Sequence, residues 1–576
     1  MSFFTWTNVA TALAVVVGAL VVVIAAMKRQ AEKSGSWLPG LPAPPAEFKR
    51  HFMLGHLKYF ATAAPPRGGL PDILGGMSLV LGGDQAREGL TAFYFMRGKA
   101  ISAIKGEHVR KLLGSTTFRR GVPMRMKHMD RVLGTESLTL VDHSRGTPVW
   151  KSHRKLVTRG FYSESLKQMV PAIDKVALQL IGSLKKRVDP LGPAGFEVDV
   201  METMKMGTLD VIGHLAFGTD FGCSDNYNFS KLAESFQVLL EDLTYRTAGR
   251  NIFKPNLAFY SWPSERNRRN SDARNLLRGT LRDLISSRRK ELASADASST
   301  RRLDALSMML MARDGNPQES AAAAAGKPRA AVRQEKVDGM SEDALVDNLV
   351  TLLFAGFDTT SIALSFAIWL LWKNPEIHEK VRNEARRVLG DARSSLDDEA
   401  RPLANNGDVQ QLAYTAATFK EVLRLYPSAP VTFRETVSPV DLGDGLPVIP
   451  SGTKVYLPLI LTHRSDMNFT EPMLFDPERF LVPRGSSTQI NVEGAREVDE
   501  ATIERRKKEM RWWMPFSAGR RDCIGQRFAM LEGTLLLARL VLAFDFDFPE
   551  GYDPDPIMTG PIITPSTPLR AHARAV

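Results

Sequence analysis

The stretch FSAGRRDCIG, residues 516–525, surrounds a cysteine with residue types that can present its sulfur to a ligand. The chain has 2 cysteines, and Cys523 stands directly before a long apolar segment that is typical of a buried helix. A helix N-terminus offers free N–H groups and a positive dipole end, so we expect a lowered pKa for this thiol. Gly519 and Gly525 allow sharp turns and close approach to a flat group. Arg521 can supply a fork of donors for a carboxylate.

Several roles are open to a cysteine in such a loop. A small buried hydrophobe is the commonest fate of a free cysteine. A zinc site needs further cysteines or histidines at ligand spacing, and a nucleophile needs a nearby histidine base; neither is indicated around Cys523. The remaining role is thiolate ligand to a large, planar, carboxylate-bearing cofactor, a description that haem fits.

A second candidate site lies within the apolar run 341–374, which predicts one helix of about 50 Å. Its middle reads AGFDTT, and a buried carboxylate such as Asp358 is costly unless it has a function. Ala355 and Gly356 remove side-chain bulk, so a flat ring can lie against the helix. Thr359 can hydrogen-bond bound dioxygen, and Asp358 can relay protons. The alternative is a core or transmembrane helix that tolerates an Asp–Thr pair.

Two further pairs of residues have helical spacing. Glu421 and Arg424 in KEVLR share one helix face, and DPERF adds Arg479. Taken alone, such a pair is more often a surface ion pair of little energetic value. Trp150 and Arg154 in WKSHR also share a face, with a buried tryptophan beside a snorkelling arginine as the alternative.

Together these stretches resemble the cytochrome P450 family of haem-thiolate monooxygenases, in its membrane-anchored eukaryotic microsomal form. FSAGRRDCIG matches the pattern F-x-x-G-x-R-x-C-x-G of the cysteine-ligand loop. AGFDTT resembles the distal helix with its acid–alcohol pair, KEVLR with DPERF resembles the ExxR motif, and WKSHR resembles the helix that binds the haem propionates. The similarity runs over essentially the whole chain, so a mainly α fold with small β-sheets is expected.

The resemblance implies a role for each of these residues. Cys523 is then the axial ligand of the haem iron, and Asp358 and Thr359 are catalytic. The residues expected to contact the haem are Phe516, Gly519, Gly525, Ala355, Gly356, Arg521, Trp150, Arg154 and Arg434. The residues expected to be structural, because they hold the cysteine loop in place, are Glu421, Arg424 and Arg479.

Positioning these residues requires a largely helical domain, expected over residues 60–576. Apolar periodicity predicts helices over 148–162, 165–188, 199–217, 229–245, 264–293, 341–373, 375–389, 410–425 and 525–543. Strand-like pieces are short and late, at 440–449, 454–458 and 561–570. Two polar stretches indicate poorly ordered insertions, at 293–339 and 485–510, and the second separates the PERF-like segment from the cysteine loop.

The N-terminus predicts a single transmembrane helix. Residues 9–27 are almost wholly apolar and can span about 28 Å as a helix. Basic residues follow this run but none precedes it, which places the rest of the chain in the cytoplasm. The alternative is a cleaved signal peptide, which normally has a basic n-region and a shorter apolar region. We expect an anchor over 1–30, a basic, proline-rich hinge over 31–59, and location in the endoplasmic reticulum membrane.

The activity that the resemblance implies is insertion of one oxygen atom of O2 into a small lipophilic substrate. Haem b is the expected cofactor, and NADPH–cytochrome P450 reductase the expected electron donor, with cytochrome b5 as a second candidate. The net charge of +11 suits an acidic partner or an anionic membrane, whereas no nucleic-acid signature is present. A monomer is expected. The alternatives are a haem-thiolate isomerase or dehydratase, whose members tend to lose the distal threonine, and a non-enzymatic haem-binding protein. Fatty acid, sterol, terpenoid and xenobiotic substrates all stay open.

Overall fold

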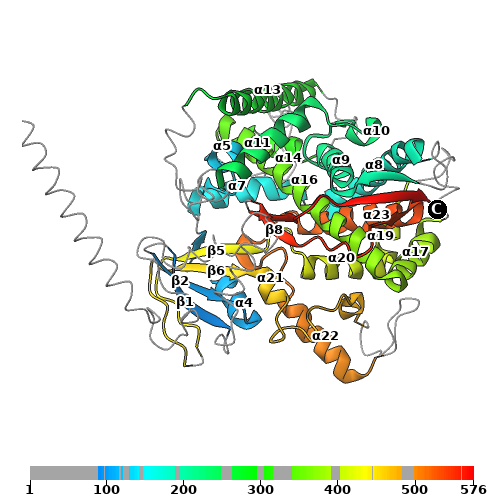
Figure 1. Ribbon diagram of the computed structural model, residues 1–576. Helices are drawn as coiled ribbons and strands as arrows, with labels where there is room; N and C mark the ends of the chain where they lie inside the picture. Colours follow the sequence, from blue (N-terminus) through cyan, green and yellow to red (C-terminus); the bar gives the residue numbers. More distant parts are fainter. Residues whose placement is uncertain are drawn as a thin grey trace, which may run out of the picture.

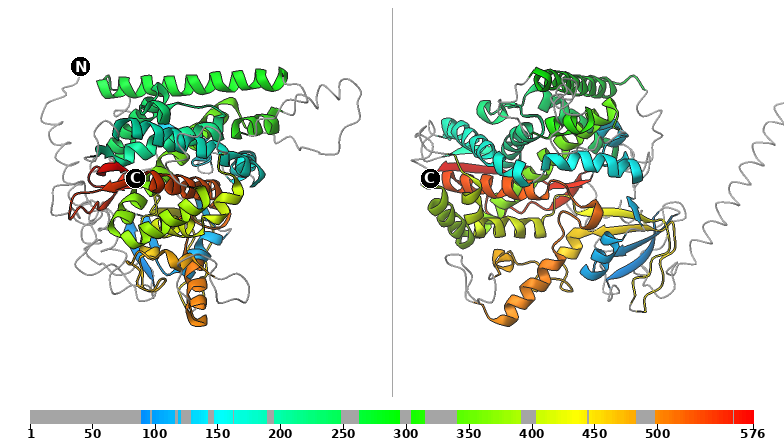
Figure 2. Two further views of the ribbon diagram at one scale, coloured as in Figure 1. Left: turned by 90° about the vertical axis from the view of Figure 1, so that its right-hand side faces the viewer. Right: turned by 180° about the vertical axis from the view of Figure 1, so that it is seen from behind.

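The structure is a computed structural model, shown in Figures 1 and 2. The residues that it describes are 89–95, 98–115, 118–120, 129–141, 147–161, 163–188, 195–247, 262–294, 304–314, 340–390, 403–443, 445–482, 498–559 and 561–576. The predicted anchor and hinge lie outside these residues. Within them the fold is mainly α with small sheets, as the sequence predicts.

The long helix α16, Glu342–Lys373, runs through the middle of the helical body. Ser341 caps it, because its side chain accepts a hydrogen bond from the N–H of Ala344. Among the described helices, α16 alone is long and apolar enough to cross a membrane, but most of it is buried inside the protein. Its apolar composition is therefore explained by its place in the core.

The other predicted helices are all present, with ends that differ by a few residues. They are α7 (Thr147–Thr158), α8 (Ser163–Val188), α9 (Val200–Ile212), α11 (Lys231–Thr247), α13 (Glu265–Ser294), α17 (Pro375–Leu389), α20 (Ala413–Leu425) and α23 (Gln526–Ala543). Short helical segments extend two of these. They are Arg159–Phe161 after α7 and Gly213–Phe217 after α9.

Three sheets accompany the helices. The largest has the order β1-β2-β6-β5-β3, in which β2 and β6 pair in parallel and the other neighbours are antiparallel. Its strands are β1 (Leu90–Phe95), β2 (Gly98–Ala103), β3 (Phe118–Arg120), β5 (Val431–Thr436) and β6 (Lys454–Pro458). The order β4-β10-β7 forms the second sheet, and β8 pairs with β9. Their strands are β4 (Phe196–Asp199), β7 (Phe544–Asp547), β8 (Pro556–Thr559), β9 (Ile562–Pro565) and β10 (Arg570–Ala575).

Of the three predicted strands, one is confirmed, one is wrong and one is confirmed in part. The prediction for 454–458 is confirmed by β6. The stretch 440–449 is not a strand, because it contributes only an isolated bridge between Val440 and Ile449. The stretch 561–570 contains β9 and the first residue of β10.

Both predicted insertions contain a well-packed helix, so their description as poorly ordered polar loops is wrong for those parts. In the first stretch, α14 (Ala305–Asp314) buries Leu306, Met309 and Leu310 against the core. In the second, α22 (Glu500–Trp512) stands at the bottom of the body in Figure 1. Apolar periodicity did not predict α22 as a helix, because few of its buried residues are apolar.

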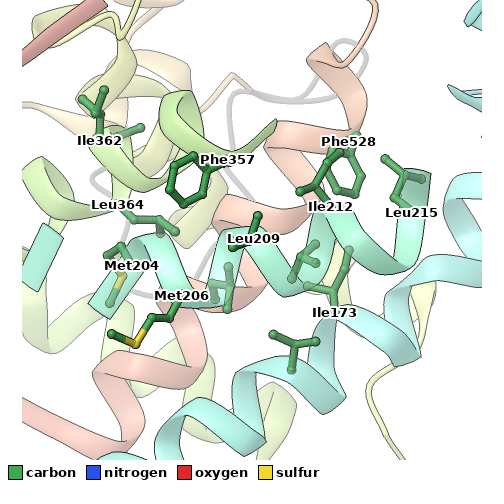
Figure 3. Close-up of a cluster of buried hydrophobic side chains, with 14 of the residues drawn as sticks. Ile173, Met204, Met206, Leu209, Ile212, Leu215, Phe357, Ile362, Leu364 and Phe528 are labelled. Atoms are coloured by element: carbon green, nitrogen blue, oxygen red, sulfur yellow. The ribbon is translucent and has the colours of Figure 1, made fainter. Parts of the chain in front are cut away.

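The main core joins α16 to the helices on either side of it. Figure 3 shows Phe357 of α16, Ile212 of α9, Phe528 of α23 and Ile173 of α8 in one cluster of buried side chains. All four side chains are buried. The contact between α16 and α23 matters for the site, because one helix carries AGFDTT and the other begins just after Cys523.

Candidate functional site

The cysteine loop lies between the short helix η7 (Gly519–Arg521) and α23. The N–H of Cys523 donates to the carbonyl of Phe516 over 2.9 Å, which closes the loop. Gly519 has a φ of +74°, and a Cβ on it would lie 2.5 Å from the carbonyl oxygen of Leu113, so this position requires glycine. Gly525 has a φ of −81°, so the turn does not depend on its lack of a side chain.

Cys523 is an exposed residue, although its thiol is surrounded by much of the protein. Burial raises the pKa of the thiol, and the N–H of Gly525 and the charge of Arg154 only partly oppose this effect. Asp522 raises the pKa further. The expectation that the helix N-terminus lowers this pKa is therefore wrong for the protein alone, because loss of solvation outweighs the dipole. A nearby cation on the accessible side is needed to favour the thiolate.

The predicted pair on α7 is brought to this loop. The guanidinium of Arg521 stacks on the ring of Trp150, with its carbon 3.3 Å from the ring centroid. Arg154 donates to Asp522 in two ways: Nη1 bonds the carbonyl over 2.7 Å and Nη2 bonds Oδ1 over 2.5 Å. In the protein alone, Arg154 therefore holds the residue that precedes Cys523.

Arg434 approaches the same loop from β5. Its side chain is buried, and Nη2 lies 3.4 Å from the hydroxyl of Ser517. Three guanidinium groups, those of Arg154, Arg434 and Arg521, thus contact the loop or its tryptophan, and Arg154 is paired with Asp522. Guanidinium groups in this place suit a ligand that carries carboxylates.

The middle of α16 is exposed on one face although its flanks are buried. Ala355 is exposed and Thr359 half-buried, one helical turn apart, whereas Phe357 and Asp358 are buried. Exposure in the centre of a core helix means that this face borders a space within the body. Gly356 does not share this role, because a Cβ there would lie 2.7 Å from the side chain of Ile212. Its missing side chain serves the packing of α9 on α16, which corrects the interpretation that it makes room for a flat ring.

The acid–alcohol pair has a partner that the sequence did not reveal. Lys205 of α9 lies 3.5 Å from Oδ1 of Asp358. Burial raises the pKa of Asp358, and the charge of Lys205 lowers it in part. The hydroxyl of Thr359 donates to the carbonyl of Ala355 over 2.6 Å, which leaves its oxygen able to accept a hydrogen bond. No signal in the sequence could link Lys205 to AGFDTT, since only the packing of two helices brings them together.

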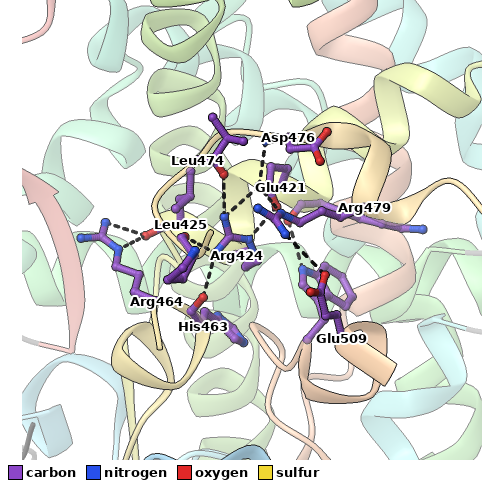
Figure 4. A network of polar contacts seen from close by, with 12 residues as sticks. Glu421, Arg424, Leu425, His463, Arg464, Leu474, Asp476, Arg479 and Glu509 are labelled. Carbon is purple, nitrogen blue, oxygen red and sulfur yellow. Dashed lines mark hydrogen bonds and ion pairs between the residues drawn. The ribbon is translucent and has the colours of Figure 1, made fainter. Parts of the chain in front are cut away.

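The predicted structural triad is assembled and fully buried (Figure 4). Arg424 donates twice to Glu421, over 2.7 and 2.8 Å, and Nε of Arg479 lies 3.3 Å from the same carboxylate. Arg424 also donates to the carbonyls of His463, Pro472 and Leu474. Burial raises the pKa of Glu421, and both arginines lower it. The alternative of a surface ion pair is therefore wrong, because all three side chains lie in the interior.

Comparisons with known proteins agree with this architecture. The cytochrome P450 family model matches residues 91–572. Secologanin synthase 1 of Catharanthus roseus is 28% identical over 406 residues, which cover 70% of this chain and 66% of that protein. Cytochrome P450 4A10 of Rattus norvegicus is 27% identical over 403 residues, covering 69% and 67%. The crystal structure of the cytochrome P450DA heme domain superposes with a TM-score of 0.69 at 22% identity, covering 94% and 98%.

A fold of this kind, with an exposed cysteine before a buried helix and a buried Glu–Arg–Arg triad, is that of a haem-thiolate class of protein. The chain belongs to the cytochrome P450 family. Its match spans about two thirds of the length of the plant relatives.

The residues of the site fit a haem group. Cys523 is accessible at the start of α23, and the arginines beside it can pair with carboxylates. These residues would hold the iron and the propionates respectively.

One buried acid near the site predicts a pH effect. Glu532 of α23 is fully buried, and burial raises its pKa well above the ordinary value, with the hydroxyl of Thr360 opposing in part. The unfolded chain ionises this group above about pH 4.3, whereas the folded protein ionises it only at a higher pH, so the folded state loses stability as pH rises between the two pKa values. We expect Glu532→Gln to gain thermal stability relative to the native protein between pH 5 and pH 8, by up to about 1.4 kcal/mol per pH unit. Melting temperatures across this range, with the exposed Glu504→Gln as control, measure the effect; a constant difference would contradict it.

Proposed function

We propose that this protein is a haem-dependent monooxygenase that inserts one oxygen atom of O2 into a small lipophilic substrate. The observation that carries the proposal is the exposed Cys523, on a loop that is contacted by Arg154, by Arg434 and by the stack of Arg521 on Trp150. Haem b, when bound, supplies the activation of dioxygen and the oxygen transfer itself. The family match supports this class of activity.

The chain's own residues contribute placement and proton supply. Cys523 donates its sulfur, while Trp150, Arg521 and Arg434 orient the carboxylate edge of the cofactor. Burial raises the pKa of Asp358, which favours its role as a proton donor beside Thr359 in the chain. Lys205 opposes that effect, so the Asp358–Lys205 contact sets how readily the acid gives up its proton.

We further propose a single-pass membrane anchor at residues 9–27, location in the endoplasmic reticulum and a monomeric state. An acidic flavoprotein reductase that draws on NADPH, with cytochrome b5 as a second donor, suits the net charge of +11. An isomerase or dehydratase is not favoured, because such relatives tend to lose the distal threonine and Thr359 is present.

Reconstitution tests the proposal directly. The full chain, purified with haem and mixed with reductase, NADPH and a library of lipophilic compounds, should show substrate-induced spectral shifts. Products should carry label from 18O2. Absence of the reduced carbon monoxide band of a thiolate-ligated haem would overturn it. Turnover of hydroperoxides with no need for reductase would instead support the isomerase class.

Asp358→Asn tests the proton supply. The amide keeps the shape but carries no acidic proton, so we expect product formation to fall about 100-fold. NADPH consumption should fall less, because electron delivery does not depend on this residue. Asp343→Asn on the exposed first turn of the same helix, whose side chain is 69% exposed, is the matched control and should behave as the native protein. Equal product yields from the two variants would remove Asp358 from the mechanism.

A further inference from the structure

The helix α22 lies between the PERF segment and the cysteine loop, and it turns charged side chains toward the protein. Asp499 caps its first turn by accepting from the N–H of Thr502 over 2.8 Å. One face, which includes Arg505, Lys508 and Arg511, is exposed. The opposite face buries Ile503, Arg506 and Glu509. Two of these three inward side chains carry charge, which burial disfavours unless each charge is paired.

Glu509 is paired from two sides. Its Oε1 accepts from the N–H of Thr470 over 2.8 Å, and its Oε2 lies 3.4 Å from Nη1 of Arg479. Arg479 in turn contacts Glu421 through Nε and donates through Nη2 to the carbonyl of Glu471. The guanidinium of Arg479 therefore stands between two buried carboxylates, as Figure 4 shows.

Charge balance depends on this arrangement. Glu421 alone would face two buried guanidinium groups, those of Arg424 and Arg479. With Glu509, two carboxylates face two guanidiniums in the interior. Arg506, one turn earlier, repeats the pattern, because it donates to the carbonyl of Leu481 over 2.9 Å and lies 3.7 Å from Glu478.

Hydrogen bonds connect the segment between Glu509 and Cys523 to the rest of the protein. Trp513 donates through its ring N–H to the carbonyl of Lys420, in the helix that carries Glu421 and Arg424, over 3.0 Å. The N–H of Met514 donates to Nε2 of His463 over 2.9 Å. Burial lowers the pKa of His463 to about 3, so this ring stays neutral and able to accept at ordinary pH. We therefore expect a displacement of α22 to move the segment that leads to Cys523 as well.

We propose that Glu509 is a positioning residue for the cysteine loop, acting through Arg479 as the fourth member of the buried Glu421–Arg424–Arg479 network. This inference rests on the proposed function, because it assigns a support to the residue that would ligate the haem. It also gives α22, a helix in the longer connection between PERF and the cysteine loop, a role at the site. Removing the charge at position 509 leaves Arg479 with one carboxylate that it must share with Arg424.

Glu509→Gln tests this role with little change of shape. The amide oxygen can still accept from Thr470, but the charge that faces Arg479 is gone. We expect the haem-loaded variant to convert from the thiolate-ligated to the non-thiolate carbon monoxide band about tenfold faster than the native protein. Helical circular dichroism, recorded in parallel, should be unchanged over the same period. Glu504→Gln on the exposed face of α22 makes the same chemical change and should convert at the native rate.

Two further variants guard against a folding defect. Glu509→Asp keeps the charge on a shorter side chain and should convert at an intermediate rate. In Arg479→Met, adding Glu509→Gln should have no further effect, because the residue through which it acts is already absent.

The outcomes separate the two proposals. A native protein without a thiolate-ligated band would overturn the proposed function. A native protein with that band, but with equal conversion rates for Glu509→Gln and Glu504→Gln, would overturn the positioning role alone. If the helical circular dichroism signal and the thiolate-ligated band of Glu509→Gln are lost at the same rate, Glu509 is an ordinary stabilising residue. That result would also overturn the positioning role.

Discussion

Cys523→Ala is expected to abolish the thiolate-ligated carbon monoxide band and to reduce NADPH-dependent product formation to background. Alanine removes the sulfur, and none of the described residues near the loop offers a second cysteine, so nothing replaces the ligand. The fold should survive, because the side chain is accessible and its truncation leaves no filled space to collapse. Absorbance of the reduced carbon monoxide complex and the haem content of the purified protein measure the result.

The other cysteine provides a matched control. Cys223 is fully buried in the helical core, where burial and the charge of Asp210 raise its pKa to about 11. A thiol in that state is inert. Cys223→Ala should cost roughly 1 kcal/mol of stability through a small cavity and leave the band in place. If Cys523→Ala keeps the band while Cys223→Ala loses it, the assignment of the ligand is wrong.

Residues that are close in the sequence were the ones whose roles the sequence could predict. Glu421 and Arg424 share a helix turn, and the loop around Cys523 is one continuous motif. Spacing places Glu421 and Arg424 on one helix face, whereas the resemblance to the family, not the spacing, added the distant Arg479 and a structural role for all three residues. The long helices could be predicted because apolar periodicity is a local property.

Contacts between distant segments could not be predicted in this way. Lys205 reaches Asp358 only because α9 packs on α16, and the same packing turns Gly356 toward Ile212. The raised pKa of the Cys523 thiol has a similar origin, because desolvation depends on how many elements surround the sulfur. The helix α22 escaped prediction because its inward face is largely charged, and those charges are paired by residues up to 39 positions away along the chain.

Arg424→Met is expected to prevent formation of a stable, haem-loaded protein. Arg424 is fully buried and donates to both oxygens of Glu421 and to three backbone carbonyls. Methionine fills much of the volume but leaves these acceptors without a donor and leaves Glu421 with Arg479 as its remaining guanidinium contact. Breaking a buried pair in this way costs about 3–5 kcal/mol, a large share of the roughly 5–15 kcal/mol that stabilises a protein.

The conservative replacement should fail as well. Arg424→Lys keeps the charge but not the planar fork that lets Nε and Nη2 bond Glu421 while Nη1 reaches the carbonyls of His463 and Pro472. We expect both variants to lower the melting temperature by roughly 10 °C or more. Arg386→Met is the control, because Arg386 is an exposed residue of α17 that donates to Asn383 of the same helix over 3.4 Å; it should stay within about 2 °C of the native protein. Because Arg424 touches neither Cys523 nor the exposed face of α16, a variant that unfolds early but keeps its band while folded would show that the triad contributes only stability. Loss of the band in a variant that is still folded by circular dichroism would show that the triad also holds the cysteine loop in place.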